Sequence, residues 1–427
     1  AMTPPQHASP ANNHPLAGTR MSGADIVVQV LADENVDTIF GYSGGAILPT
    51  YDAVFRYNDK HRGADGKSPM PLIVPANEQG AGFMASGYAR ASGKVGVVMV
   101  TSGPGATNTV TPVRDCMADS VPVVVICGQV PRSAVGTDAF QEAPVSAIMG
   151  AVAKHVFLVT DPERLEATIR SAFELARTGR PGPVVIDIPK DVQNWEGAFM
   201  GSGALPLTGY RRRLQAVTEN RLTDESCERF FEMLAESERP LIYAGGGVIN
   251  ANAAKSMRRL ASEYGIPVTT TLMALGASDT RHPLALHMLG MHGLASANYA
   301  VEDCDFLMAV GARFDDRVAG DPARFAPNAK RIAHFDVDSA EIGKVKRVDW
   351  HHVGLLDRDL TELLAYGRRI GFSKDFQAWH EEIAHLKQEH CLNYDRDSEL
   401  IQPYAVIEEI NKHAKGEAII STGVGQH

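Results

Sequence analysis

The sequence has no long apolar run, few cysteines and no excess of positive charge. Its longest apolar stretch, residues 121–127, has the length of a strand, whereas a membrane-spanning helix needs roughly 18 residues. The formal net charge of −10 argues against a nucleic-acid scaffold or a protein bound to an anionic membrane surface. The composition is otherwise ordinary for a soluble globular protein, with 22% charged residues.

Cysteine use indicates reduced thiols in a cytoplasmic protein, or in an organelle matrix after removal of a targeting segment. The cysteines are widely spaced, odd in number and form no CxxC pair, which argues against a zinc knuckle; they are Cys116, Cys127, Cys227, Cys304 and Cys391. Three histidines recur every five residues, a spacing that places them on no common helical face and predicts no metal site: His282, His287 and His292.

The 427 residues, 44% of them hydrophobic, suffice for two or three domains. β-branched runs bounded by Gly and Pro alternate with helical stretches, a pattern typical of parallel sheets covered on both faces. We therefore expect an α/β fold with doubly wound parallel sheets. The predicted strands of a first unit are residues 36–40, 95–101, 121–127 and 183–189, and those of a second are 240–244, 267–271, 305–311 and 331–337.

The predicted division of the chain follows from these strands. Residues 1–20 are read as a disordered lead, 21–193 as the first α/β domain and 221–365 as the second. Residues 194–220 and 366–400 lack clear strand or domain signals and are predicted linkers. A helix over 403–415 and a strand over 418–422 predict that residues 401–427 open a third α/β unit.

Glu78 is the most informative residue, because it lies between a strand-like run, residues 72–75, and a helix of small residues. An acid at a helix start is often only a favourable partner of the helix dipole. The same position also suits a carboxylate in a dry cleft that shares a proton with a ring nitrogen. Residues 75–93 resemble the glutamate segment of thiamine diphosphate enzymes, although Asn77 stands where many members carry His.

Further segments extend this resemblance to the catalytic subunits of acetohydroxyacid (acetolactate) synthases. They are residues 41–49, 101–108, 128–131, 136–142 and 178–183. The resemblance implies that Glu78 hydrogen-bonds the aminopyrimidine ring of thiamine diphosphate and that the Gly45 backbone approaches its reactive end. It also implies that Phe140 and Gln141 line the pocket, with Gln141 catalytic, and that Lys190 attracts anionic 2-ketoacids.

The same resemblance predicts an FAD site in the second domain. The Gly-rich turn at 245–247 alone is a weak nucleotide signal, but residues 286–293 and 311–317 resemble the flavin-binding segments of the family. Two flavin-contacting positions fall in the first domain, Ser120 and Arg180. Those in the second domain are Gly246, Thr271, Leu272, Met273, Leu289, Gly290, Met291, His292, Gly311, Arg313, Asp315 and Asp336.

The magnesium anchor of thiamine enzymes, a Gly-Asp-Gly segment, does not occur in the sequence. We therefore predict no metal ligand within this chain, although Mg²⁺ is an implied cofactor. Gln426 and His427 match the first diphosphate-contacting residues of the family's third domain. The resemblance thus covers about two-thirds of a family protein. Either the sequence is part of a longer enzyme, which we favour, or it is a product that binds flavin but cannot hold thiamine diphosphate alone.

The implied activity decarboxylates pyruvate and ligates the two-carbon unit to a second pyruvate or to 2-ketobutyrate, at the entry to branched-chain amino-acid biosynthesis. A homodimer or higher oligomer, with a regulatory small subunit, is the implied assembly. One alternative is another flavin-containing thiamine enzyme such as pyruvate oxidase; glyoxylate carboligases characteristically lack the glutamate that is present as Glu78. The other is a catalytically silent flavin-binding fragment.

Overall fold

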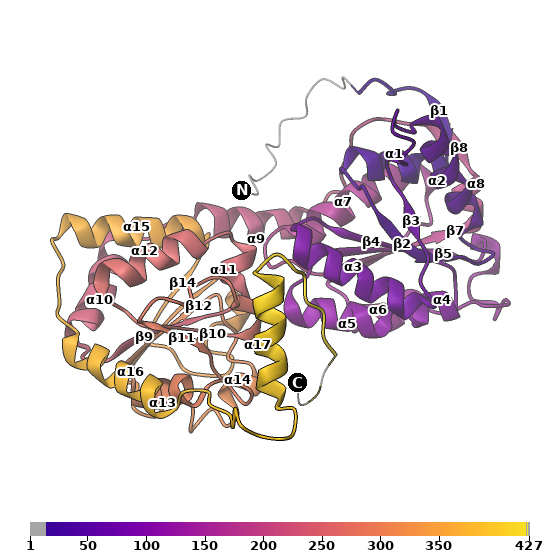
Figure 1. The fold of residues 1–427 in the computed structure, drawn as a ribbon. Helices are drawn as coiled ribbons and strands as arrows, with labels where there is room; N and C mark the ends of the chain where they lie inside the picture. Colours follow the sequence, from indigo (N-terminus) through magenta and orange to yellow (C-terminus); the bar gives the residue numbers. More distant parts are fainter. Residues whose placement is uncertain (1–13, 424, 426–427) are drawn as a thin grey trace.

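The computed structural model describes residues 14–423 and 425, which form two α/β lobes lying side by side (Figure 1). The predicted doubly wound fold is confirmed, because each lobe is built on a six-stranded, all-parallel sheet. Among the described residues, none of the helices is both long enough and apolar enough to cross a membrane.

The N-terminal lobe contains the sheet β3-β2-β4-β5-β7-β6 and a short antiparallel pair, β1 with β8. The strands are β1 (Arg20–Ser22), β2 (Ile39–Tyr42), β3 (Leu72–Ile73), β4 (Gly96–Val100), β5 (Val123–Gln129), β6 (His155–Leu158), β7 (Val184–Pro189) and β8 (Glu196–Ala198). The helices are α1 (Gly23–Asp33), α2 (Leu48–Lys60), α3 (Glu78–Ser92), α4 (Pro104–Thr107), α5 (Val110–Asp119), η1 (Arg132–Ala134), α6 (Val145–Gly150), η2 (Pro162–Arg164), α7 (Leu165–Arg177) and α8 (Lys190–Asn194).

Two apolar layers enclose this sheet. Side chains of α1, α2, α7 and α8 pack on one face, and those of α3, α5 and α6 pack on the other. Successive residues of β7 point alternately into the two layers: Val184 and Ile186 face the first, and Val185 faces the second. Strand β7 is therefore buried on both faces, as its mostly β-branched sequence predicted, although it contains one acid, Asp187.

The second lobe contains the parallel sheet β11-β10-β9-β12-β13-β14. In Figure 1, α12 and α15 lie above this sheet and α13 and α16 below it. Its strands are β9 (Pro240–Ala244), β10 (Val268–Thr270), β11 (Ala285–Met288), β12 (Phe306–Val310), β13 (Arg331–Asp336) and β14 (Trp350–Val353). Its helices are α10 (Asp224–Glu236), α11 (Gly246–Asn250), α12 (Ala254–Tyr264), η3 (Leu272–Ala274), α13 (Ala295–Asp303), α14 (Asp316–Ala319), η4 (Ser339–Glu341), α15 (Leu356–Arg369) and α16 (Gln377–Glu389).

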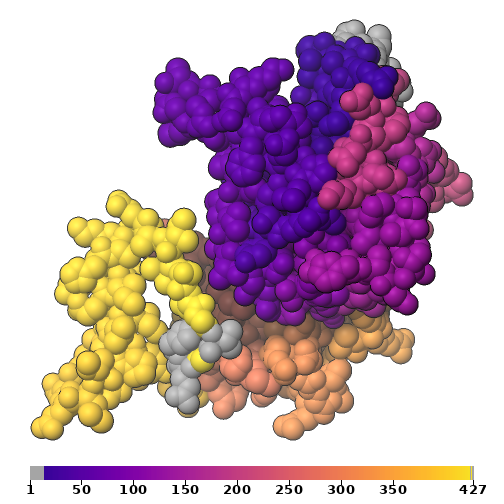
Figure 2. Space-filling view, turned by 90° about the vertical axis from the view of Figure 1, so that its right-hand side faces the viewer, coloured from indigo at the N-terminus to yellow at the C-terminus, as the bar shows by residue number. Residues whose placement is uncertain are grey.

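The segments between and after the lobes differ from the sequence-based expectation. The predicted linker 194–220 contains β8 and a helix, α9 (Thr208–Glu219). The predicted helix near the end of the chain is α17 (Pro403–Ala414), which has no buried residue. Figure 2 shows this C-terminal segment, in yellow, standing at one side of the molecule. The strand expected at 418–422 is wrong: those residues form none, since no neighbouring strand pairs with them and Ile419 is 95% exposed.

Candidate active site

The loops predicted to hold the cofactor gather at the carboxyl edge of the N-terminal sheet. Strands β3 and β4 lie on opposite sides of β2, so the strand order reverses between β2 and β4. Ligands of open α/β sheets bind at such a reversal, beyond the carboxyl ends of the strands. The loops after β2, β3 and β4 contain residues 43–47, 74–77 and 101–103, and all three belong to the predicted motifs.

Glu78 is the first residue of α3, and its side chain is only 8% exposed. The helix starts there because the Asn77 side chain accepts a hydrogen bond from the backbone N–H of Gly80, at 2.8 Å. One Glu78 oxygen accepts a hydrogen bond from the Asn108 amide, Nδ2 to Oε2, at 2.9 Å. Sequence reasoning missed Asn108, although it closes the 101–108 motif, because nothing in the sequence links it to Glu78, thirty residues away.

A buried phenol lies near the same carboxylate. The Tyr51 hydroxyl donates to the backbone carbonyl of Met99 at 2.9 Å. Burial, and after it the negative charge of Glu78, raise the pKa of Tyr51 well above its usual range. Tyr51 therefore stays a neutral donor.

The glycine-rich loop after β2 is held on both sides. The backbone N–H of Ala46 donates to Thr101 Oγ1 at 3.2 Å, and the Gln193 amide donates to the Ala46 carbonyl at 2.7 Å. A Cβ at Gly44 would collide with the Thr101 side chain, whereas a Cβ at Gly45 would meet open space. The Gly45 backbone is thus presented to whatever lies in front of the loop, as the predicted cofactor contact requires.

The loop after β5 carries Phe140 and Gln141. Phe140 is 88% exposed, and Gln141 adopts a left-handed backbone conformation with φ of 56°. Its backbone packs on Gly103, where a Cβ would clash with the Gln141 carbonyl oxygen, so the loop lies against the same 101–108 segment that bonds Glu78. Lys190, half-buried, is the first residue of α8 beyond β7 at the same sheet edge.

These residues fit thiamine diphosphate at its ring end. Glu78 supplies a nearly buried acceptor, Gly45 an unobstructed backbone, and Phe140 an uncovered aromatic ring. The predicted diphosphate contacts Gln426 and His427 lie outside the described residues. Among the residues that the structure describes, no cluster of three or more His, Cys, Asp or Glu side chains is arranged to hold a metal ion.

The predicted flavin residues gather at the carboxyl edge of the second sheet. In this sheet the order reverses between β9 and β12, where Gly245 and Gly247 approach Gly311 too closely for any side chain. Gly246 lies beside Met273, and the Met291 N–H donates to the Arg317 carbonyl at 2.8 Å. The structure places the remaining predicted positions at the carboxyl ends of these strands or in the segments that follow them: Thr271, Leu272, Leu289, Gly290, His292, Arg313, Asp315 and Asp336.

This edge has features that suit an extended dinucleotide. The hydroxyl oxygen of Thr271 is buried without a hydrogen-bond partner among the described residues. Leu272 and Met291 expose most of their apolar surface. Gly290 has φ of 100°, a conformation that a side chain would strain. Arg313, half-buried, has its guanidinium 3.2 Å from the Asp315 carboxylate. The residues therefore fit FAD, with Leu289 buried beneath the loop rather than facing it.

Ser120 and Arg180 join this edge to the N-terminal lobe. The Arg180 guanidinium donates to Ser120 Oγ at 2.9 Å and lies 2.7 Å from the Glu341 carboxylate and 3.4 Å from that of Asp338. Ser120 is itself left-handed, with φ of 58°, and its carbonyl accepts a bond from Asn250 of α11. Both predicted flavin contacts are thus part of the junction between lobes.

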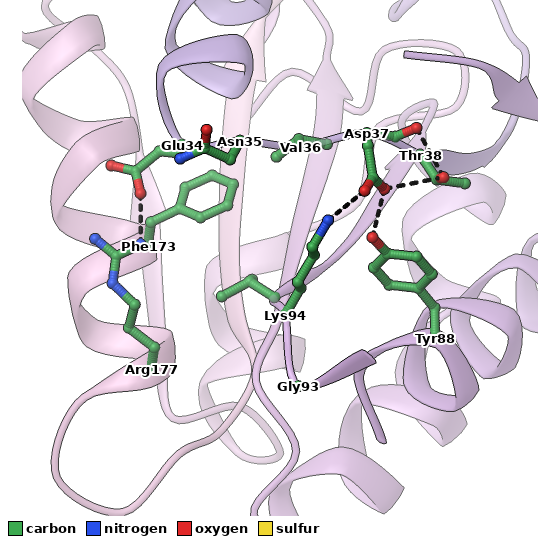
Figure 3. A pocket seen from close by; sticks show the side chains of 11 residues that line it. Glu34, Asn35, Val36, Asp37, Thr38, Tyr88, Gly93, Lys94, Phe173 and Arg177 are labelled. Atoms are coloured by element: carbon green, nitrogen blue, oxygen red, sulfur yellow. Dashed lines mark hydrogen bonds and ion pairs between the residues drawn. The ribbon is translucent and has the colours of Figure 1, made fainter. Parts of the chain in front are cut away.

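A separate pocket of about 150 Å³ lies at the opposite, amino edge of the N-terminal sheet (Figure 3). Its charged groups are paired with one another. Asp37 accepts from Tyr88 and Lys94, and Arg177 lies 2.5 Å from Glu34. None of the predicted site residues lines this pocket, so it is no part of the candidate active site.

Comparison with known proteins agrees with this arrangement. Residues 21–148 match the family model described as "Thiamine pyrophosphate enzyme, N-terminal TPP binding domain". Residues 227–363 match "Thiamine pyrophosphate enzyme, central domain". The first match contains Glu78 and the loops around it, and the second contains the β9–β12 reversal.

Curated relatives match nearly the whole chain. The acetolactate synthase large subunit of Corynebacterium glutamicum is 44% identical over 96% of this chain and 63% of its own length. The chloroplastic acetolactate synthase 1 of Zea mays is 44% identical over 95% of this chain and 61% of its own length. The chloroplastic acetolactate synthase of Arabidopsis thaliana is 43% identical over 95% of this chain and 58% of its own length. The chain thus spans about three-fifths of the length of these relatives.

Proposed function

Because this chain belongs to the thiamine pyrophosphate enzymes, we propose that it acts as the catalytic subunit of an acetolactate synthase. Similarity to acetolactate synthases along almost the entire chain supports this activity over others in the family. The structural observation that carries the proposal is Glu78, which is nearly buried at the strand-order reversal and hydrogen-bonded by Asn108.

The proposed reaction joins the two-carbon unit of pyruvate to a second pyruvate or to 2-ketobutyrate, with loss of carbon dioxide. When bound, thiamine diphosphate supplies a ring that accepts the electrons released as carbon dioxide leaves. Glu78 holds a proton at a nitrogen of that ring, and Asn108 fixes the orientation of the carboxylate.

Three further residues are proposed to act on substrate. Phe140 and Gln141 cover the reactive end from the loop after β5, where the Gln141 amide hydrogen-bonds a ketoacid oxygen. Lys190, at the start of α8, attracts the anionic substrate by its charge. The common position of both loops at the carboxyl edge of one sheet supports these roles.

FAD and Mg²⁺ are proposed as further cofactors. The edge of the second sheet offers the unpartnered Thr271 hydroxyl, the close glycines around Gly311 and the exposed surfaces of Leu272 and Met291 to a flavin dinucleotide. Its role here is structural, since the proposed reaction involves no net electron transfer to the flavin. Mg²⁺ would neutralise charge on the diphosphate of a bound thiamine cofactor; the positions that the sequence predicts to contact that diphosphate, Gln426 and His427, lie outside the described residues.

A second copy of the chain is the proposed partner of the face around Glu78. Apolar side chains at the end of β3 and just after it, on α3 and at the start of α2 are exposed there: Leu48, Ile73, Val74, Phe83 and Met84. Such a group of exposed apolar residues is typical of an interface between subunits. A regulatory small subunit, and a location in the cytoplasm or in an organelle matrix, remain predictions.

The direct test is acetolactate formation from pyruvate by the holoenzyme supplied with thiamine diphosphate, Mg²⁺ and FAD. Glu78→Ala should lower this rate about 10²- to 10⁴-fold, the usual contribution of a positioned acid or base, and leave flavin absorbance intact. Gln79→Ala, an exposed neighbour in the same turn, is the matched control and should keep its rate. Equal rates for Glu78→Ala and the control would refute the role of Glu78.

The two alternatives give different results in the same preparation. A pyruvate oxidase would consume oxygen in proportion to pyruvate, which an oxygen electrode measures. A silent flavin-binding protein would show flavin absorbance without any product. Acetolactate formation without oxygen uptake is the outcome that the proposal predicts.

A further inference from the structure

Asp187 is an acid inside the N-terminal lobe to which the proposed reaction assigns no role. It lies on β7 and is 2% exposed. Its Oδ2 accepts a hydrogen bond from Gln129 Nε2 at 2.9 Å. Its other oxygen, Oδ1, is buried and has no hydrogen-bond partner in the described part of the chain. Ionising the carboxyl group in such a place is unfavourable in free energy, because one of its oxygens has been removed from water without gaining a hydrogen bond from the protein.

No cation faces this carboxyl group from the elements packed on β7. Its register partners on β5 and β6 are Cys127 and Leu158, and α6 contains no titratable residue. Burial raises the pKa of the Cys127 thiol well above its usual range, so that group stays neutral. The other titratable side chains of these elements do not face Asp187. Helix α7 packs on the opposite face of the sheet, and His155 of β6 is the register partner of Val184. Lys190 and Asp191 of α8 make no ion pair with Asp187 among the described residues.

Gln129 connects Asp187 to the loop of the candidate site. Its amide nitrogen also donates to the carbonyl of Ala143, at 3.2 Å, and its oxygen accepts from the backbone N–H of Val130, at 2.9 Å. Both amide hydrogens and the amide oxygen are therefore used. Val130 and Ala143 are the two ends of the loop that carries Phe140 and Gln141, so one buried side chain ties both ends of this loop to Asp187.

We propose that Asp187 is a positioning residue that holds the 130–143 loop in place while its carboxyl group is protonated, and that its ionisation loosens the loop. The Gln129 amide already donates one N–H to Asp187 Oδ2, and its second N–H now donates to the Ala143 carbonyl. If that N–H turns to Asp187, the Ala143 carbonyl loses its partner and the C-terminal end of the loop is freed. Burial raises the pKa of Asp187 to about 7, so this change falls near neutral pH.

We call the bonds from Gln129 to Asp187 and Ala143 the latch. Any effect of the latch on catalysis rests on the proposed function, whereas its effect on the loop can be measured in the chain alone. Its test is hydrogen exchange of the peptide covering residues 130–145, measured without cofactor or substrate at pH 6 and pH 8.5 and corrected for the intrinsic rate. We expect protection in the wild-type chain to fall several-fold at the higher pH. Asp187→Asn, which cannot ionise, should stay protected at both values.

Two further variants keep the test decisive. Gln129→Met removes the tie and should exchange fast at both pH values, whether or not Asp187→Asn folds. Glu142→Gln weakens a separate tie, the bonds from Gly136 and Ala139 to the Glu142 carboxylate, and should raise exchange while keeping the pH dependence. A wild-type loop equally protected at pH 6 and 8.5, or an Asp187→Asn chain with the wild-type dependence, would overturn the latch. Absence of acetolactate formation would overturn only the proposed function.

Discussion

Replacing Asp187 by Asn should change the stability of the N-terminal lobe in a way that depends on pH. The pKa of Asp187 rises from an ordinary 3.8 to about 7 in the folded chain, chiefly because the group is buried. The folded state therefore holds a proton that the unfolded state has released between these two values. By linkage, stability falls as the pH rises from about 4 to about 7 and does not change further above that range.

The size of this loss follows from the shift. Each pKa unit corresponds to about 1.4 kcal/mol, so a shift of about three units costs the wild-type chain roughly 4 kcal/mol of unfolding free energy at pH 7. Asn at this position has the same shape and no charge to bury. The variant should thus equal the wild type near pH 4 and exceed it by a few kcal/mol at pH 7 and above.

The slowest-exchanging amides of β5 and β7 provide the assay, since their opening free energies report unfolding of this lobe alone. Asp191→Asn is a matched control of opposite sign. The N–H groups and the positive charge of Arg132 hold the pKa of Asp191 below its usual range, so this variant should lose stability above pH 4. Parallel pH curves for the wild type and Asp187→Asn would refute the argument.

Two other predictions concern the junction and the site. Arg180→Ala should lower the unfolding free energy by about 3 kcal/mol, because the buried Glu341 carboxylate then keeps only Lys344 as a cationic partner. Adding Glu341→Gln should recover part of this loss, which a thermal melt measures. Asn108→Ala should lower kcat of the holoenzyme about tenfold or more, since it removes a hydrogen bond to a charged group while KM for pyruvate stays within about twofold. A kcat equal to that of the wild type would show that Asn108 does not orient Glu78.

Much of the fold could be predicted because the central strands are mostly apolar and rich in β-branched residues. Strand β7 was expected at 183–189 and lies at Val184–Pro189, and β12 was expected at 305–311 and lies at Phe306–Val310. The edge strands β6, β11 and β14 were missed, whereas the edge strand β3 was expected within residues 72–75. The sequence of β6, His155–Leu158, has a polar first residue and no Gly or Pro directly beside it, so that only its pairing with β7 makes it a strand.

The site could be predicted only where a motif carried the information. Glu78 stands out by its place between a strand and a helix, and its burial follows from the fold. The hydrogen bond from Asn108, thirty residues away, depends on the turn at Gly103 and could not be read from spacing. The role proposed for Asp187 could not be predicted either. In the sequence, an acid near the end of an apolar strand suggests only that the strand ends there. The structure shows that Gln129 donates to one of its oxygens and that the other has no partner among the described residues.

Bonds at the junction between the lobes hold the N-terminal lobe against the carboxyl edge of the second sheet. The Lys154 ammonium donates to the carbonyls of Leu175, Thr178 and Arg180, which fixes the end of α7 and the turn that follows it. That turn directs the Arg180 guanidinium at Glu341, beyond the carboxyl end of β13. A partner that binds the second edge between Asp336 and Thr271 would therefore lie against a part of the N-terminal lobe that is fixed by buried bonds. Helix α3, which starts with Glu78, also reaches the second edge, because Arg90 of this helix contacts Met273 there. The positions of the proposed flavin and thiamine sites are therefore linked through α3.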